Sequence, residues 1–255
     1  MAVFALTGVN GGPGVSTTCL GLAMSWPRPV LLLEADPRGL SSLLTGWFQG
    51  SRPYRSGLVE LALSSLSPAD ALRDVAQTIE GTHVSYVAGP RSHAQAPVLR
   101  GVWSPLADAL AELETTGTDV IVDAGTLGAP GSPEPILARA DATLVTVRSS
   151  LPALAGARPW ADAVTREHPW QWPGLLVIGD GRPYTAREAG QALGLPVIAQ
   201  IAWDPDGANV YYQGARPPRR FETSTYVRSL RAAVSALTSM AARARVDATT
   251  AVSAS

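Results

Sequence analysis

The chain has 255 residues, of which 46% are hydrophobic, and 20 basic against 21 acidic residues give a formal net charge of −1. This balance excludes a global field that would draw in nucleic acid or an anionic membrane. All the basic residues are arginine, so no lysine is available to any site. The single cysteine, Cys19, excludes an intrachain disulfide and a cysteine-based metal site.

Short apolar runs alternate with helix-length segments, an alternation that predicts parallel βαβ units. Several runs are apolar throughout, as in strands that helices cover on both faces. The expected strands are Val3–Val9, Val30–Ala35, Val84–Ala88, Val120–Asp123, Thr143–Arg148, Leu175–Ile178 and Val197–Ile201. The expected helices are Ser16–Ser25, Leu58–Ser64, Pro68–Ile79, Pro97–Thr115, Pro133–Ala140, Leu151–Glu167, Thr185–Leu193 and Tyr226–Val246. The sequence thus predicts a doubly wound α/β fold with a mostly parallel sheet, whose ligands lie beyond the carboxyl ends of the strands.

One domain is expected over residues 1–246, and the small, polar segment 247–255 is expected to be a disordered tail. No apolar run approaches the ~20 residues that a membrane span requires, and no basic leader precedes the first expected strand. We therefore expect a cytoplasmic protein.

The stretch "NGGPGVST", Asn10 to Thr17, follows the first expected strand and opens the first expected helix. Its glycines let backbone N–H groups converge on an anion, and the helix adds its positive N-terminal end. Ser16 stands where a phosphate-loop hydroxyl ligates Mg²⁺, whereas Val15 stands where such a loop needs a lysine. A glycine-rich turn that only packs a helix on a strand is the alternative interpretation. The candidate nucleotide-binding residues are Asn10, Gly11, Gly12, Pro13, Gly14, Val15, Ser16 and Thr17.

Carboxylates end two further expected strands. Asp36 follows "LLLEA" and is the candidate catalytic residue, since a carboxylate there can orient water or reach a magnesium-bound water, and Glu34 shares its face of the strand. Asp123 ends "DVIVD", in the layout of an aspartate that holds Mg²⁺ through water. Both aspartates have a plainer interpretation, as turn or helix caps. The candidate metal-site residues are Ser16, Asp36 and Asp123.

These segments resemble the ParA/MinD group of deviant Walker A P-loop ATPases. The group's loop, K-G-G-x-G-K-[ST]-T, aligns with "NGGPGVST" without a gap, and its D-x-D-P-x-G segment resembles "EADPRG", with Glu34 and Asp36 in the acidic places. The stretch "GLPVIAQIAWDPDGANVYYQG" is similar to a late stretch of the group, and the resemblance extends to about Ala242. It implies a P-loop NTPase fold, ATP and Mg²⁺ as ligands, and assembly as a nucleotide-sandwich dimer.

The sequence departs from the group at its charged positions. Asn10 replaces the signature lysine that reaches the partner's phosphates, Val15 replaces the loop lysine, and Gly125-Thr126 replaces a proline pair. The group recognises adenine with an Asn-Arg pair, and Asp180 and Arg182 of "IGDGRP" resemble that pair only loosely. Such degeneration resembles the TadZ/CpaE branch, whose members carry atypical phosphate loops and help to position pilus-secretion machinery.

The missing lysines weaken catalysis more than binding. One charge-assisted hydrogen bond to phosphate contributes ~1.5–3 kcal/mol, roughly one to two decades of affinity, whereas a cation at the transition state is worth ~10³–10⁵ in rate. We therefore expect a non-hydrolysing scaffold or positioning factor, in a secretion or pilus system, that binds ATP and Mg²⁺ weakly or not at all. A slow ATPase that cycles between monomer and dimer is the alternative, in which an arginine replaces the lysine, with Arg38 the first candidate and Arg148 the second. A Rossmann oxidoreductase is disfavoured because "STT" follows the glycines.

Protein partners are expected, including a second copy of the chain. Membrane association through the helix expected over Tyr226–Val246 is not favoured, since its apolar stripe has no Trp or Phe and equally suits a helix that packs on the sheet. DNA association through "ARPPRR", the only local basic cluster, is not favoured either, and a solvated loop is the plainer interpretation.

Overall fold

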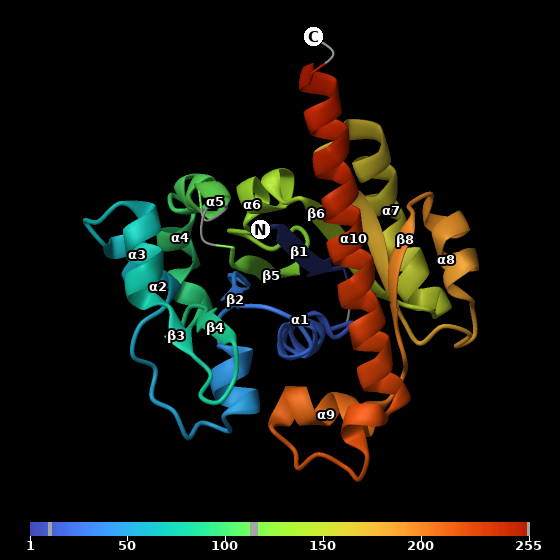
Figure 1. The fold of residues 1–255 in the computed structure, drawn as a ribbon, viewed down its shortest axis with the longest axis horizontal. Coiled ribbons are helices and arrows are strands. Elements are labelled where there is room, and N and C mark those ends of the chain that lie inside the picture. The colour runs from blue at the N-terminus through green and yellow to red at the C-terminus, as the bar shows by residue number, and fades with distance from the viewer. Residues whose placement is uncertain (10–11, 113–116, 254–255) are drawn as a thin grey trace.

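The computed structural model describes residues 1–9, 12–112 and 117–253 (Figure 1). Within these residues one eight-stranded sheet has the order β3-β4-β2-β5-β1-β6-β7-β8, and only the β3–β4 pair is antiparallel. The strands are β1 (Val3–Gly8), β2 (Val30–Glu34), β3 (Gln77–Thr78), β4 (Val84–Val87), β5 (Asp119–Thr126), β6 (Ala142–Arg148), β7 (Pro173–Ile178) and β8 (Val197–Ile201). The predicted doubly wound, mostly parallel α/β fold is therefore confirmed.

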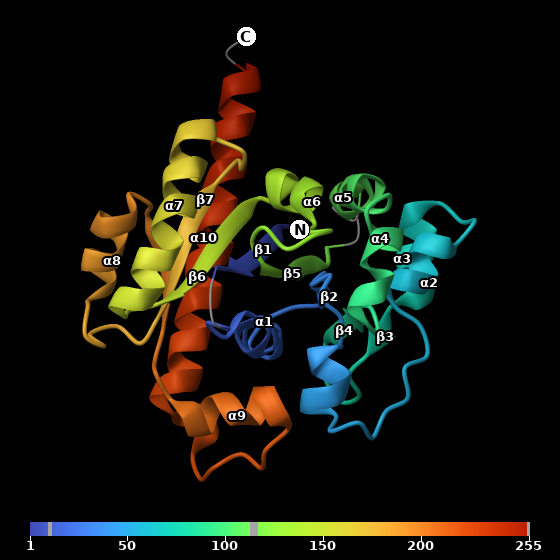
Figure 2. The same cartoon turned by 180° about the vertical axis from the view of Figure 1, so that it is seen from behind.

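Helices cover both faces of the sheet (Figures 1 and 2). They are α1 (Val15–Met24), α2 (Leu58–Leu63), α3 (Pro68–Val75), α4 (Ala96–Leu99), α5 (Trp103–Glu112), α6 (Glu134–Arg139), α7 (Leu151–Glu167), α8 (Ala186–Leu193), α9 (Pro205–Gln213) and α10 (Thr225–Ser253). A π-helical segment spans Leu43–Trp47, and short 3-10 turns span His93–Gln95 and Phe221–Thr223.

The strands are continuous apolar runs, and their side chains contribute to a hydrophobic core on each face of the sheet. In β1, Val3 and Ala5 join the core under α2 to α8, while Phe4 and Leu6 join the core under α1, α9 and α10. Successive side chains of a strand point to opposite faces, so a strand covered on both sides needs apolar residues at every position.

Two expected helices differ in the structure. The helix expected over Pro68–Ile79 ends at Val75, because Gln77 and Thr78 pair with β4 as the edge strand β3. The helix expected over Pro97–Thr115 is divided into α4 and α5, and its residues 113–115 lie outside the described part of the chain. Glycine is a poor helix former and Pro105 has no N–H for the carbonyl of Gly101, so the helix is interrupted over residues 100–102, around Gly101.

Helix α9 is an element that the sequence analysis did not identify. It begins at Pro205, and its N-cap Asp204 accepts a hydrogen bond of 2.9 Å from the Gly207 N–H, while Gly214 closes the C-terminus in a left-handed conformation. These are ordinary start and stop signals. Together with the turn after β8, this helix forms one wall of the site described below.

Helix α10 packs its apolar stripe on the sheet. The stripe is buried in the core shared with α1 and α9, and its members are Val227, Leu230, Val234, Leu237 and Ala241. The boundary predicted at residue 246 falls within this helix, which ends at Ser253, and disorder of the tail stays a prediction. In the part of the chain that the structure describes, no helix is both long and apolar enough to cross a bilayer.

Candidate functional site

A cavity of about 500 Å³ lies beyond the carboxyl ends of the central strands, where the loop after β1 meets the turns after β5, β6 and β8. Six of the candidate nucleotide-binding residues line it, namely Gly12, Pro13, Gly14, Val15, Ser16 and Thr17. The other two, Asn10 and Gly11, lie outside the described residues. Ligand sites of open α/β sheets lie at this end of the strands, so the position of the cavity agrees with the sequence-based expectation.

The described part of the loop requires glycine. Gly12 and Gly14 have φ of 61° and 101°, a region that side chains with a Cβ rarely adopt. Gly14 is also the N-cap of α1 and, having no side chain, leaves the first N–H groups of the helix without a side-chain cap. A helix N-terminus of this kind, opening on a cavity, can accept an anion.

Val15 turns its side chain into the core and offers no charge to the cavity. It is 7% exposed and belongs to the cluster under α1, α9 and α10. The loop folds back tightly over the end of β1: a Cβ built on Gly8 would lie 2.6 Å from Cγ of Pro13 and 3.0 Å from Cγ2 of Val15. The position that holds the lysine in a phosphate loop therefore holds a packed hydrocarbon.

Ser16 and Asp123 meet at the base of the loop. The Ser16 hydroxyl donates a hydrogen bond to the Asp123 carboxylate, and the Gly125 N–H donates to Oδ1 of Asp123 at 3.0 Å. The pKa of Asp123 is raised to about 7, chiefly by burial and also by the nearby carboxylates of Asp36 and Glu34, which together outweigh the lowering effect of these hydrogen bonds. Two of the candidate metal-site residues are thus in contact.

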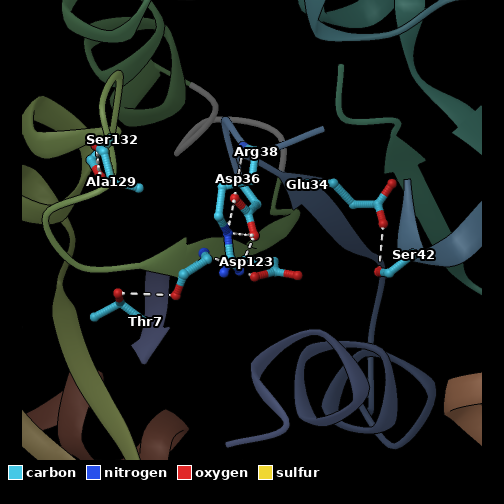
Figure 3. Close-up of polar contacts among 9 residues, drawn as sticks. Thr7, Glu34, Asp36, Arg38, Ser42, Asp123, Ala129 and Ser132 are labelled. Carbon is cyan, nitrogen blue, oxygen red and sulfur yellow. Dashed lines mark hydrogen bonds and ion pairs between the residues drawn. The ribbon is translucent and has the colours of Figure 1, made fainter. Parts of the chain in front are cut away.

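The carboxylate of Asp36 is held by Arg38 (Figure 3). Its Oδ1 accepts hydrogen bonds from the Arg38 backbone N–H at 2.9 Å and from Nε at 3.0 Å, and its Oδ2 accepts one from Nη2 at 2.6 Å. A Cβ built on Gly125, whose φ is 64°, would lie 2.3 Å from Cγ of Asp36. Proline cannot adopt a positive φ, so the group's proline pair is incompatible with this arrangement.

Glu34 has a structural role. It is 5% exposed, and its carboxylate accepts a hydrogen bond of 2.8 Å from the Ser42 hydroxyl (Figure 3). It also accepts hydrogen bonds from the Ser41 hydroxyl and, at 2.9 Å, from the Leu43 N–H. The Gly89 N–H donates a further bond of 3.3 Å from the end of β4. These bonds fix the segment after β2, and with it Ser42 on the cavity wall.

Among the described residues, no group of three or more His, Cys, Asp or Glu side chains is arranged to hold a metal ion. Ser16 and Asp123 instead line a space of about 10 Å³, together with Thr17 and Glu34. That is close to the smallest volume that holds one water molecule. The Mg²⁺ of P-loop proteins is held by one hydroxyl, one aspartate and the phosphates of the nucleotide, and the chain supplies the first two of these.

The far wall of the cavity contains Arg148, the second candidate to replace the loop lysine, together with residues to which the sequence analysis assigned no role. Trp203 follows β8 and is 38% exposed, while Asn209 and Tyr212 lie on α9. Arg148, at the end of β6, donates a hydrogen bond of 3.1 Å from Nη2 to the carbonyl of Gly12, and its guanidinium carbon lies 5.2 Å from the centre of the Trp203 ring. The tryptophan two residues after β8 and the Asp204-Pro205 start of α9 are the signals in the sequence that could have indicated this wall.

The fold has clear structural counterparts. The cell division ATPase MinD of Pyrococcus furiosus superposes with a TM-score of 0.73 at 14% identity, over 94% of this chain and 99% of that protein. MinD of Pyrococcus horikoshii, complexed with Mg-ADP, gives 0.70 at 15% identity over 91% and 94%. The MinC:MinD complex of Aquifex aeolicus gives 0.72 at 13% identity over 94% and 96%.

No family profile and no curated protein sequence matches the chain. The resemblance to the ParA/MinD group is therefore confirmed at the level of the fold, through these structures. At identities near 14% the fold is what they establish.

Proposed function

We propose that this chain is a degenerate P-loop protein of the ParA/MinD type, which binds ATP and Mg²⁺ weakly and does not turn ATP over at an enzymatic rate. It acts in the cytoplasm as a scaffold or positioning factor for protein partners, in a secretion or pilus system. The observation that carries the proposal is the buried Val15 at the position of the loop lysine.

The hydrocarbon side chain of Val15 provides no positive charge to stabilise the transition state. A cation placed on the transferring phosphate is worth ~10³–10⁵ in rate, and Val15 cannot supply it from the core. The ion pair between Asp36 and Arg38 acts in the same direction. A carboxylate whose two oxygens already accept hydrogen bonds from a guanidinium is poorly suited to orient an attacking water.

Binding depends on parts that the chain retains. The cavity of about 500 Å³ is large enough for a small-molecule ligand, and the uncapped N-terminus of α1 with Gly12 and Gly14 suits a phosphate. Ser16 and Asp123 would hold Mg²⁺, which when bound neutralises phosphate charge. The structurally similar MinD of Pyrococcus horikoshii is complexed with Mg-ADP, which supports the same ligand class here.

A role through partners fits a site that binds but does not turn over. The structurally similar MinD of Aquifex aeolicus forms a complex with MinC, so this fold can serve as a platform for another protein. A second copy of the chain is one expected partner, and the degenerate loop points to the TadZ/CpaE-like setting.

Slow ATP hydrolysis is the second candidate, and one observation favours it. Ser16 and Asp123 remain in contact at the base of the loop, the arrangement that an active P-loop needs for Mg²⁺. The two residues that would hold Mg²⁺ are thus both present, whereas valine replaces the loop lysine.

Calorimetry and a phosphate-release assay with ATP and Mg²⁺ test the proposal together. We expect weak binding and no phosphate release above that of an Asp36→Ala control. Release at a typical enzymatic rate that Asp36→Ala abolishes would replace the scaffold with the ATPase. Tight binding of a dinucleotide, or no binding of any nucleotide, would contradict both candidates.

A further inference from the structure

Two arginines lie on the cavity wall among the residues that the structure describes, and they differ in their partners. Arg38 is paired with Asp36, so its charge is largely neutralised. Arg148 takes part in no ion pair within the described part of the chain. Arg148 therefore provides the uncompensated positive charge of this wall.

The fold brings Arg148 to the phosphate loop. Strand β6 lies beside β1 in the sheet, with Thr146 in register with Gly8 at the end of β1, so β6 continues past that end to Arg148, beside the loop. From there Nη2 of Arg148 reaches the Gly12 carbonyl at 3.1 Å. A guanidinium has five N–H donors in a rigid fork, so this single bond leaves donors that can face the cavity.

The ring of Trp203 contacts the same guanidinium. The Arg148 guanidinium carbon lies 5.2 Å from the centre of the Trp203 ring, within the range of a cation–π contact. An arginine held at both a carbonyl and an aromatic face loses less conformational freedom on binding an anion than a free side chain would. The contact with Trp203 thus holds the Arg148 guanidinium in position beside the phosphate loop.

We infer that Arg148 is the phosphate-binding cation of this site, supplying from β6 the charge that Val15 does not supply from the loop. The ligand class is the phosphate chain of a nucleoside di- or triphosphate. The inference rests on the proposed nucleotide binding and adds the residue that carries its charge. It also replaces Arg38, the first candidate of the sequence analysis, which is engaged with Asp36.

A purely structural clamp is the alternative, in which Arg148 only ties the loop to Trp203. Arg148→Gln separates the two roles, because glutamine keeps an N–H for the Gly12 carbonyl but removes the charge. Arg187→Gln is the matched control, since Arg187 is exposed on α8, away from the cavity.

Calorimetric titrations with adenosine, AMP, ADP, ATP and inorganic triphosphate measure the effect in the full chain. We expect Arg148→Gln to weaken ATP and triphosphate binding by about ten- to a hundredfold, the range for one charge-assisted hydrogen bond. The loss should shrink for AMP and vanish for adenosine, and Arg187→Gln should bind as the wild type does. Arg148→Lys, which restores a positive charge, should bind ATP more tightly than Arg148→Gln.

Several results would overturn the inference. An Arg148→Gln loss that is equal for adenosine and ATP would indicate a structural clamp, as would equal weakness of the Lys and Gln variants. Unchanged ATP binding in Arg148→Gln would overturn the inference and leave the proposed function standing. A wild-type protein that binds none of the five ligands would overturn the proposed function itself. Because Arg148→Lys keeps the charge, its comparison with the wild type remains informative if the glutamine variant folds poorly.

Discussion

Replacing Val15 with lysine should tighten ATP binding without starting turnover. The Val15 side chain is 7% exposed, and burying a valine fully is worth ~1.5–3 kcal/mol. A lysine keeps part of this packing through its methylene stem while its ammonium reaches the cavity, so we expect a loss of about 1 kcal/mol in the free energy of unfolding. The new charge-assisted contact to phosphate should raise ATP affinity by roughly tenfold, the lower end of its range.

Turnover should stay flat in Val15→Lys because Arg38 still holds the Asp36 carboxylate through both oxygens. Groups that act as one catalytic unit are strongly non-additive, so restoring one missing part recovers little rate. The double variant Val15→Lys/Arg38→Gln frees the carboxylate and is the matched comparison. We expect any increase in phosphate release to occur in the double variant alone.

Calorimetry gives the affinities, a phosphate-release assay at saturating ATP and Mg²⁺ gives the rates, and urea unfolding gives the stability change. Phosphate release by Val15→Lys alone at about 1 s⁻¹ or faster, within the ordinary enzymatic range, would refute this reasoning. It would mean that the pair between Asp36 and Arg38 opens readily once the loop carries its charge.

Three further predictions concern assembly and stability. Assembly should not depend on ATP, since Asn10 cannot carry a charge to a partner's phosphates; a clear monomer-to-dimer shift in sedimentation on adding ATP and Mg²⁺ would contradict this. Deleting α10 should lower solubility and melting temperature, because it would expose the core that the helix covers; a truncated chain that stays folded but no longer binds anionic liposomes would instead support the membrane alternative. Asp119→Ala should cost about 2–6 kcal/mol in urea unfolding, because it leaves the buried Trp26 Nε1–H and Ala2 N–H without their acceptor. Burial raises the pKa of Asp119, but the hydrogen bonds from Arg28, Trp26 and Ala2 outweigh it and lower that pKa overall. The stabilisation is therefore present above the ordinary aspartate pKa and lost as the pH falls through the lowered folded value, so an Asp119→Asn variant should approach the wild type in strong acid and differ most at neutral pH.

The sequence by itself determined the fold class and the place of the site. All seven predicted strands are present, because strands buried on both faces need continuous apolar runs that are easy to recognise. The glycine-rich loop and the carboxylates of Asp36 and Asp123 were predicted to share one end of the sheet. That prediction follows from parallel pairing, which brings the carboxyl ends of the strands to one level.

Two elements that the sequence analysis missed, β3 and α9, have separate local explanations. The edge strand β3 forms from residues that also suit a helix end, and its pairing with β4 outweighs that propensity. Helix α9 has ordinary caps, but it is only nine residues long and buries only Gly207, Val210 and Tyr211, so its apolar pattern is too short to identify a helix.

Only the tertiary structure determines which groups the charged side chains contact. Arg38 and Asp36 are two residues apart, but a sequence does not determine whether two such side chains form an ion pair or bind a ligand. In the structure they form the ion pair, and the Asp36 carboxyl group lies close to Gly125. Arg148 lies 136 residues from Gly12 in the chain and reaches it because β6 neighbours β1 in the sheet. Side-chain contacts across a sheet depend on strand order and register, and these are set by the packing of the whole domain.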